Sequence, residues 1–248
     1  MNVVVLGAGG LLGSACLRIF NESPSINAVG TFRSKYDHNQ FPYDTKQHYF
    51  LSDALDIAQL EVLFQQLRPS VVVNCTSLSK NSLQLTDPLE LIPIYALLPH
   101  ILAKFCSRFS ARLIQISSDG VFSGDKGNYS EEDIPDASDL YGRTKLMGEV
   151  VAQGCVTLRT SMIGHDPTLK NGLVSWFLNQ EGSCKGFCNA IFSGFPVTVL
   201  ARIIRDYVLS DQKLEGVYNL ASVPISKFDL LRLISEIYAT NVTVIPDY

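Results

Sequence analysis

The chain has 248 residues, of which 46% are hydrophobic and 18% are charged, and its formal net charge is −4. This length and composition predict one large globular α/β domain with a small appendage, and they exclude a mostly disordered protein. The slightly acidic balance has no basic stripe and no polybasic tail, which argues against nucleic acid or an anionic membrane as a partner, so we expect a small ligand.

No targeting segment is predicted. The first apolar run, Val3 to Leu6, is too short for a signal sequence, and no later apolar segment is expected to reach about 18 residues. We therefore expect a cytoplasmic protein that does not enter a membrane. Most of the six cysteines lie in apolar runs, as reduced core thiols do. Cys184 and Cys188 have a metal-ligand spacing, but no second Cys or His pair is near them in sequence, so no metal site is predicted.

The chain opens with a strand, a glycine-rich turn and a helix. Residues 2–6 are apolar, residues 7–13 read Gly-Ala-Gly-Gly-Leu-Leu-Gly, and apolar residues then recur at helical spacing as far as Phe20. Such glycines let the backbone approach a pyrophosphate, which the helix N-terminus would bind. A tight turn without a ligand is the alternative, but the position after a first strand favours a dinucleotide site. Its predicted cofactor-binding residues are Gly7, Gly10, Leu11, Leu12 and Gly13.

A second predicted strand, Ala28 to Phe32, is followed by a cation. Arg33 stands about where an acidic residue would hold the adenosine 2′-hydroxyl of NAD, and this favours the 2′-phosphate of NADPH. Asp37 lies close enough to keep NADH as the alternative. Farther along, Asp56 is predicted to cap a helix, and Asp53 either reaches the adenine amino group of the cofactor or has only a capping role.

Two buried strands are expected to end over the same crevice. Residues 70–74 have the continuous apolar character of a parallel strand, and a strand at 112–116 leads to Ser118. Carboxyl ends of parallel strands deliver side chains to the ligand crevice of an open sheet. After the first of these strands, the predicted cofactor-binding residues are Cys75, Thr76 and Ser77.

A long helical segment is predicted from Asp87 and Pro88 to about Arg108, and Pro93 and Pro99 inside it predict kinks or a late start. Segment 185–196 has no clear period and is interpreted as a substrate-covering segment. The remaining expected elements are a strand at 155–159 and helices at 171–180, 200–209 and 227–238. This alternation predicts a doubly wound parallel sheet.

Tyr141 and Lys145 are the strongest catalytic signal. They are four residues apart, so on a helix they share one face, where an ammonium favours the phenolate form. Such a pair taken alone is more often structural, with the Lys stem lying against the ring. Together with the hydroxyl of Ser118, however, the pair predicts a site for proton donation.

Three motifs carry a resemblance to a known family. They are GAGGLLG at 7–13, ISSDGVFSG at 116–124 and YGRTKLMGE at 141–149. They resemble the extended short-chain dehydrogenase/reductases, and most of all the dTDP-4-dehydrorhamnose reductase type. The resemblance implies a Rossmann fold and reduction of a nucleotide-linked 4-keto-6-deoxy sugar by NADPH (or NADH), in the biosynthesis of deoxysugar and surface polysaccharide precursors. The catalytic residues it implies are Ser118, Tyr141 and Lys145, of which Tyr141 and Lys145 also bind the cofactor.

The resemblance also divides the chain. Residues 1–160 and about 197–223 are expected to form the dinucleotide-binding domain, and 161–196 with 224–248 a small substrate-binding lobe. Three features depart from the family pattern. Gly120 replaces a larger side chain, and Tyr95 stands where many relatives have a helix Asn that relays protons. Residues 192–196 lack the Pro-Thr block that the family usually has near the sugar nucleotide.

Other interpretations stay open. A nucleotide-sugar epimerase or dehydratase would use the same residues with tightly held NAD, and Asp119 or Glu149 as a further acid or base, although Glu149 is more simply a surface partner of Lys145. The regulatory subunit of methionine adenosyltransferase resembles the same family, so a cofactor-binding protein without turnover is the third possibility. We expect a nucleotide sugar as the ligand, and a homodimer is possible.

Overall fold

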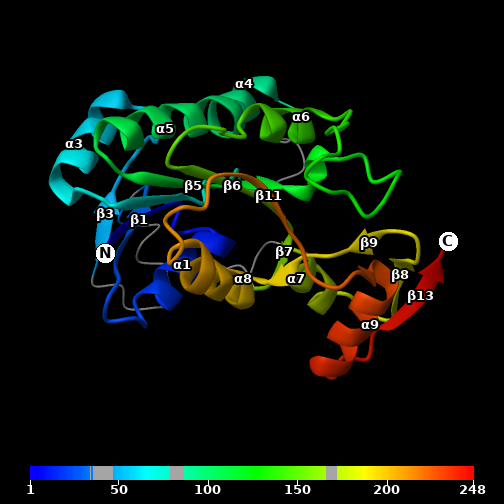
Figure 1. Cartoon of the computed structure of the whole chain (residues 1–248). Coiled ribbons are helices and arrows are strands. Elements are labelled where there is room, and N and C mark those ends of the chain that lie inside the picture. Colours follow the sequence, from blue (N-terminus) through cyan, green and yellow to red (C-terminus); the bar gives the residue numbers. More distant parts are fainter. Residues whose placement is uncertain (34, 36–46, 79–86, 166–171) are drawn as a thin grey trace.

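A parallel sheet between two layers of helices forms most of the molecule (Figure 1). The structure, a computed structural model, describes residues 1–33, 35, 47–78, 87–165 and 172–248. In sheet order the seven strands are β11 (Gly216–Leu220), β6 (Cys155–Thr160), β5 (Arg112–Ser118), β4 (Val71–Asn74), β1 (Asn2–Leu6), β2 (Asn27–Phe32) and β3 (His48–Phe50). Every neighbouring pair is parallel, which confirms the predicted doubly wound sheet.

The order of the strands reverses between β1 and β4. The chain moves from β1 outward through β2 and β3, then returns to place β4 on the other side of β1, followed by β5, β6 and β11. In open α/β sheets, ligands bind beyond the carboxyl ends of the strands at such a switch point. The glycine-rich turn after β1 and residues 75–77 after β4 both lie at this point.

Each face of the sheet has its own apolar core. On one face lie α1 (Leu11–Phe20), α8 (Val197–Ile203) and a π-helical turn, η4 (Ile204–Val208); on the other lie α3 (Ile57–Leu67), α5 (Leu98–Arg108) and α6 (Leu140–Met147) (Figure 1). The central strands are buried on both faces, so their sequences are continuously apolar rather than alternating. The two cores hold the strand ends, and with them the candidate site, in fixed positions.

The segment 87–108 forms one continuous helical run of three parts. These are α4 (Pro88–Leu91), a π-helical stretch η2 (Ile92–Leu97) and α5, and Asp87 caps the start as predicted. The helix does not begin late; the wider π-helical turn follows directly after α4 and contains Pro93. Single π-turns inside helices often mark functional sites.

The same run corrects one expectation. Among the described residues it is the one helix that is long and apolar enough to cross a membrane, with a mean hydropathy of 1.5 over 18 residues. The expectation that no later apolar segment reaches about 18 residues was therefore wrong. Its apolar side packs against the sheet, where Leu98 and Leu102 are fully buried.

A smaller lobe lies beyond one end of the sheet (Figure 1). It contains α7 (Leu173–Leu178), β8 (Ser183–Phe187), β9 (Ile191–Phe192), β12 (Ile225–Ser226), α9 (Lys227–Ile237) and β13 (Thr243–Asp247). Segment 185–196, whose sequence has no clear period, contains the end of β8 and the two-residue strands β9 and β10 (Phe195–Pro196). Its role as a substrate-covering segment stays a prediction. Val174, Phe177 and Leu231 belong to a core of its own. The exact division of the chain into domains stays a prediction.

Candidate active site

The glycine-rich turn has the tight geometry that its sequence predicts. Gly7 has a φ of 75°, and a Cβ on Gly13 would lie 2.2 Å from the Gly7 carbonyl oxygen, so a side chain there would collide with backbone. Gly10 is the N-cap of α1 and supplies no side-chain cap. The first backbone N–H groups of α1, beginning at Leu11 and Leu12, therefore point out of the helix toward the switch point, as an anion site requires.

Two other predicted cofactor contacts lie at strand ends. Thr31 near the end of β2 accepts a hydrogen bond from the Gly7 N–H at 3.2 Å, which holds β2, and the exposed Arg33 after it, beside the glycine turn. Asp37 lies outside the described residues. Beyond β3, Asp56 caps α3 as predicted, and one oxygen of Asp53 accepts the Leu55 N–H at 2.8 Å.

The predicted residues after β4 lie at the switch point, but not all their polar groups face outward. The Thr76 hydroxyl donates to Asn74 Oδ1 at 2.6 Å, and the buried Asn74 in turn donates to Gln115 at 2.8 Å. Cys75 packs partly against the core beneath the glycine turn. Ser77 is exposed, and its hydroxyl lies 3.1 Å from the hydroxyl of Tyr95.

The three predicted catalytic residues converge. Ser118 ends β5, and Asp139 caps α6, whose first turn carries Tyr141. A Cβ on Gly120 would lie 3.2 Å from Ser118 Oγ and 3.4 Å from a ring carbon of Tyr141, so the hydroxyl and the phenol ring flank one point. One turn along α6, the buried Lys145 ammonium donates to the Ile116 carbonyl at 3.2 Å. The juxtaposition that the sequence predicted is therefore present, while the roles stay predictions.

The environment of Tyr141 keeps its phenol protonated. Burial is the largest influence and raises the pKa of Tyr141 to about 12; the Ser118 hydroxyl lowers it, and Tyr95, Asp119 and Asp139 raise it further. This net direction is opposite to the expectation that the Lys145 ammonium would favour the phenolate form and so lower the pKa of Tyr141. A phenol with a raised pKa is a proton donor over the whole neutral range.

Ser118 belongs to a hydroxyl–carboxylate chain that the sequence did not reveal. Its Oγ accepts the Gly120 N–H at 3.0 Å and donates to Asp119 Oδ1 at 3.3 Å, while Ser161 donates to the other Asp119 oxygen at 2.6 Å. Ser161 follows β6 directly, where the chain leaves the sheet for the lobe. No motif marks Ser161; only the position of a polar residue just after a strand could have suggested it.

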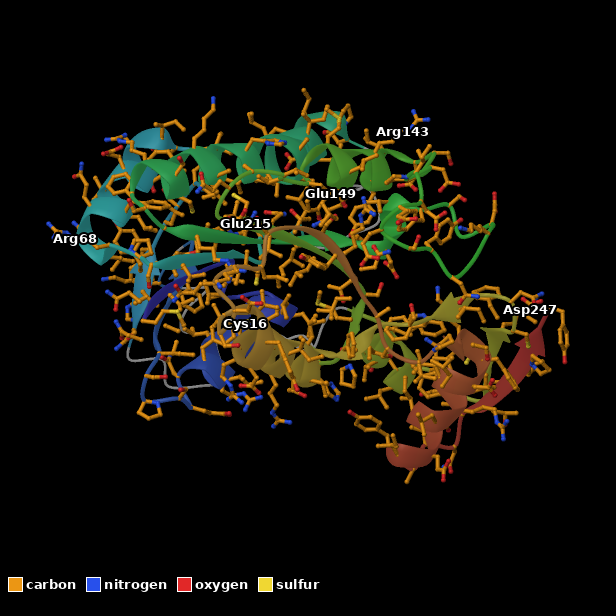
Figure 2. All side chains as sticks on the ribbon, viewed as in Figure 1. Cys16, Arg68, Arg143, Glu149, Glu215 and Asp247 are labelled. Carbon is orange, nitrogen blue, oxygen red and sulfur yellow. The ribbon has the colours of Figure 1, made fainter. Side chains whose placement is uncertain are left out.

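Glu149 lies elsewhere than expected. It is not a surface partner of Lys145, because it is buried between the α6 layer and the sheet (Figure 2) and forms a two-pronged ion pair with Arg159, at 2.7 and 2.8 Å. Ser117 donates to the same carboxylate at 2.9 Å. Arg159 Nη1 has no hydrogen-bond partner within the described part of the chain. Glu149 therefore neutralises a buried cation and is not available as an acid or base.

Comparison with known proteins finds a matching family model and related curated proteins. A family model described as RmlD substrate binding domain matches residues 1–239. Methionine adenosyltransferase 2 subunit beta from Xenopus tropicalis is 30% identical over 172 residues, which cover 66% of this chain and 47% of that protein. The probable low-salt glycan biosynthesis reductase Agl14 from Haloferax volcanii is 30% identical over 151 residues, covering 60% of this chain and 48% of that protein. The matched part thus spans about half the length of these curated relatives.

Solved structures share the fold. A hypothetical dTDP-4-dehydrorhamnose reductase from Sulfolobus tokodaii aligns with a TM-score of 0.80 and 23% identity, over 100% of this chain and 87% of that one. The dTDP-4-dehydrorhamnose reductase of Bacillus anthracis in complex with NADP aligns with a TM-score of 0.79 and 22% identity, over 99% and 83%. The resemblance to the extended short-chain dehydrogenase/reductases of this type is confirmed. The match over nearly the whole sequence means that the chain belongs to the RmlD substrate binding domain family.

Proposed function

We propose that this protein reduces a nucleotide-linked 4-keto-6-deoxy sugar with NADPH or NADH, in the biosynthesis of deoxysugar and surface polysaccharide precursors. The observation that carries the proposal is the convergence of Ser118, Tyr141 and Lys145 beside the switch point of the sheet. Membership of the RmlD substrate binding domain family supports it, since its structural neighbours include dTDP-4-dehydrorhamnose reductases.

The residues at the switch point fit a dinucleotide. The backbone of α1 begins without a side-chain cap, and Gly9 has no atom nearer than 3.8 Å to the position of a Cβ, which leaves room for a pyrophosphate over the turn. Gly7, Gly10 and Gly13 with the first N–H groups of α1 would hold the phosphates, and Arg33 would face a 2′-phosphate. Asp53 and residues 75–77 would line the adenosine and ribose.

The chemistry divides between the cofactor and the protein. When bound, NADPH supplies the hydride; the protein supplies orientation, charge and the proton. The Tyr141 hydroxyl would donate its proton to the carbonyl oxygen of the sugar as negative charge develops there, and Ser118 would hydrogen-bond the same oxygen. Lys145 would hold the nicotinamide ribose hydroxyls. The phenol with its raised pKa is protonated when the substrate arrives, as proton donation requires.

The test is a panel assay. Purified protein, NADPH or NADH, and dTDP- or UDP-linked 4-keto-6-deoxy sugars are combined, and oxidation of the reduced nicotinamide is followed by absorbance. We expect turnover with at least one sugar, and a loss of roughly 10²- to 10⁴-fold in Tyr141→Phe because the proton donor is removed. Tyr207→Phe is the matched control, because Tyr207 is exposed on η4, whose Val208 bonds Arg112 at the amino end of β5, opposite the end that carries Ser118. Full activity in Tyr141→Phe contradicts the mechanism.

The same purified protein, coenzyme and sugars distinguish this function from two others. Similarity to methionine adenosyltransferase 2 subunit beta supports a regulatory role without turnover. That role predicts NADPH binding, no oxidation with any sugar, and a stable complex when purified protein is mixed with a catalytic methionine adenosyltransferase subunit. An epimerase or dehydratase would instead convert keto sugars without added coenzyme, so product formed under that condition favours this alternative.

A further inference from the structure

Tyr95 occupies an unusual position beneath the candidate site. It is 3% exposed and lies in the π-helical stretch η2, whose backbone touches the end of α6: a Cβ on Gly148 would lie 1.8 Å from the Tyr95 carbonyl oxygen. Only glycine permits that approach. The π-helical turn and Gly148 therefore bring the Tyr95 ring under the residues of α6.

The Tyr95 ring contacts two functional side chains of α6, those of Tyr141 and Lys145. The Lys145 ammonium lies 4.5 Å from the centroid of the Tyr95 ring, and the ring of Tyr141 meets it edge-on, with centroids 5.5 Å apart and an interplanar angle of 87°. The face of an aromatic ring attracts a cation, and the attraction grows when the cation is shielded from water. Lys145 is 8% exposed, so this contact is in the stronger range.

The far end of the ring is fixed as well. The Tyr95 hydroxyl accepts the Leu78 N–H at 3.0 Å and lies 3.1 Å from the Ser77 hydroxyl. Both partners belong to the segment after β4, at the switch point. Tyr95 thus connects the segment after β4 to the Lys145 ammonium on α6.

We infer that Tyr95 is a positioning residue: its ring holds the Lys145 ammonium at the candidate site through a cation–π contact, and its hydroxyl fixes the ring against the segment after β4. The Ile116 carbonyl meets the same ammonium at 3.2 Å, so ring and carbonyl together restrain it. The inference deepens the proposed function, because Lys145 is the residue proposed to hold the nicotinamide ribose.

The first experiment measures NADPH binding, by titrating the fluorescence of the reduced nicotinamide, in the wild type, Tyr95→Phe and Tyr95→Leu. Phe keeps the ring and loses the hydroxyl, so we expect its Kd to stay within about threefold of the wild type. Leu loses the ring, and we expect its Kd to rise about 5- to 30-fold. Equal Kd values for Leu and wild type, or an equal loss in Phe and Leu, overturn the inference.

Phe109→Leu is the matched control. It removes a ring that lies 5.1 Å below the Arg108 guanidinium at the other end of α5, and NADPH binding should not change. A loss of binding there as large as in Tyr95→Leu would show that general loosening of the helix layer accounts for the effect, and would also overturn the inference.

The second experiment needs no cofactor. Urea unfolding of Tyr95→Leu, Lys145→Met and the double variant forms a mutant cycle for the ring and the ammonium. We expect a coupling of about 5- to 30-fold in the unfolding equilibrium constant, and additive effects overturn the inference. A second cycle uses Tyr95→Phe in place of Tyr95→Leu as the reference. Phe keeps the ring contact with Lys145, so in this cycle the effects should be additive. A wild type that binds NADPH and reduces no sugar refutes the proposed function only, because both experiments still report on Tyr95.

Discussion

At the scale of single residues, the candidate site is a set of hydroxyl groups and one carboxylate, joined by hydrogen bonds, around the phenol of Tyr141. Tyr141 is next to Ser118, and Ser118 donates a hydrogen bond to Asp119, which also accepts one from Ser161. Each oxygen therefore has a defined donor or acceptor before any ligand enters. To stabilise a developing oxyanion, the Ser118 hydroxyl would turn its one proton from Asp119 toward the substrate oxygen.

The raised pKa of Tyr141 has a consequence for stability. In the unfolded chain the phenol ionises near its reference pKa of about 10, whereas burial raises the pKa to about 12 in the folded chain. Its contribution to stability is therefore complete below about pH 10 and is lost as the pH rises toward about 12. We expect the urea midpoint of the wild type to fall more than that of Tyr141→Phe between about pH 9 and about pH 11.5. Parallel falls in the two proteins would contradict the raised pKa.

Asp119 contributes to that pKa through its charge. Because its carboxylate raises the pKa of Tyr141, Asp119→Asn should lower this pKa, and the Tyr141 signal in a spectroscopic titration of tyrosinate should appear at lower pH. Subtracting the titration of the matching Tyr141→Phe variant isolates the signal. Asp136→Asn is the control. The exposed Asp136 carboxylate accepts the Ser123 N–H at 2.7 Å and is not among the groups that shift the pKa of Tyr141. Equal curves for Asp119→Asn and the wild type would refute the effect.

At the scale of elements, backbone contacts too close for a side chain decide where the functional groups lie. The turn between β1 and α1 is one case, and the contact between η2 and α6 is another. At both places a glycine lets two backbones meet, so the element that follows is held at a fixed distance from the sheet or the neighbouring helix.

Gly13 and Gly9 make a matched pair of variants in one turn. A Cβ at Gly13 would lie 2.2 Å from the Gly7 carbonyl oxygen, whereas at Gly9 the nearest atom is a Phe32 ring carbon at 3.8 Å. We expect Gly13→Ala to lose about 1–3 kcal/mol of unfolding free energy through overpacking. Gly9→Ala should change it by less than about 1 kcal/mol. Urea denaturation measures both, and similar values for the two would show that the turn can relax.

At the scale of the whole molecule, polar contacts link the layers and the lobe around the site. The Glu149–Arg159 pair joins the chain at the end of α6 to β6, and Ser117 extends the link to β5. Ser161 follows β6, where the chain leaves the sheet for the lobe, and it donates a hydrogen bond to Asp119, next to Ser118. The position of α6 over the sheet, and so of Tyr141 and Lys145, depends on these links.

Removing the buried carboxylate should therefore be costly. Glu149→Gln leaves the Arg159 guanidinium, with a side chain 7% exposed, without its counter-charge, and we expect a loss of about 3–5 kcal/mol of unfolding free energy. Glu61→Gln is the control, because Glu61 pairs with the mostly exposed Arg108 at 2.6 Å, and its loss should be about 0–1 kcal/mol. Equal effects in urea denaturation would mean that Arg159 gains solvent or another partner.

Local features could be predicted from the sequence because they depend on residues that are close together along the chain. The strands at the centre of the sheet are apolar runs, and Asp56 and Asp87 bond N–H groups two or three residues ahead of them. The short strands β9 and β10 were not predicted, since two residues carry no period. The burial of Glu149 was also missed, because its partner Arg159 belongs to another element.

The sequence by itself determined the doubly wound sheet, the glycine turn and the spacing of Tyr141 and Lys145, because period, turn chemistry and helix geometry act within a few residues. Only the tertiary structure decided what surrounds those two side chains. The Tyr95 ring reaches Lys145 from a different helix, and Asp119 accepts hydrogen bonds from Ser118 and from Ser161, which follows another strand. Such contacts arise from how packed layers meet, and the pKa of the phenol follows from the burial that this packing creates.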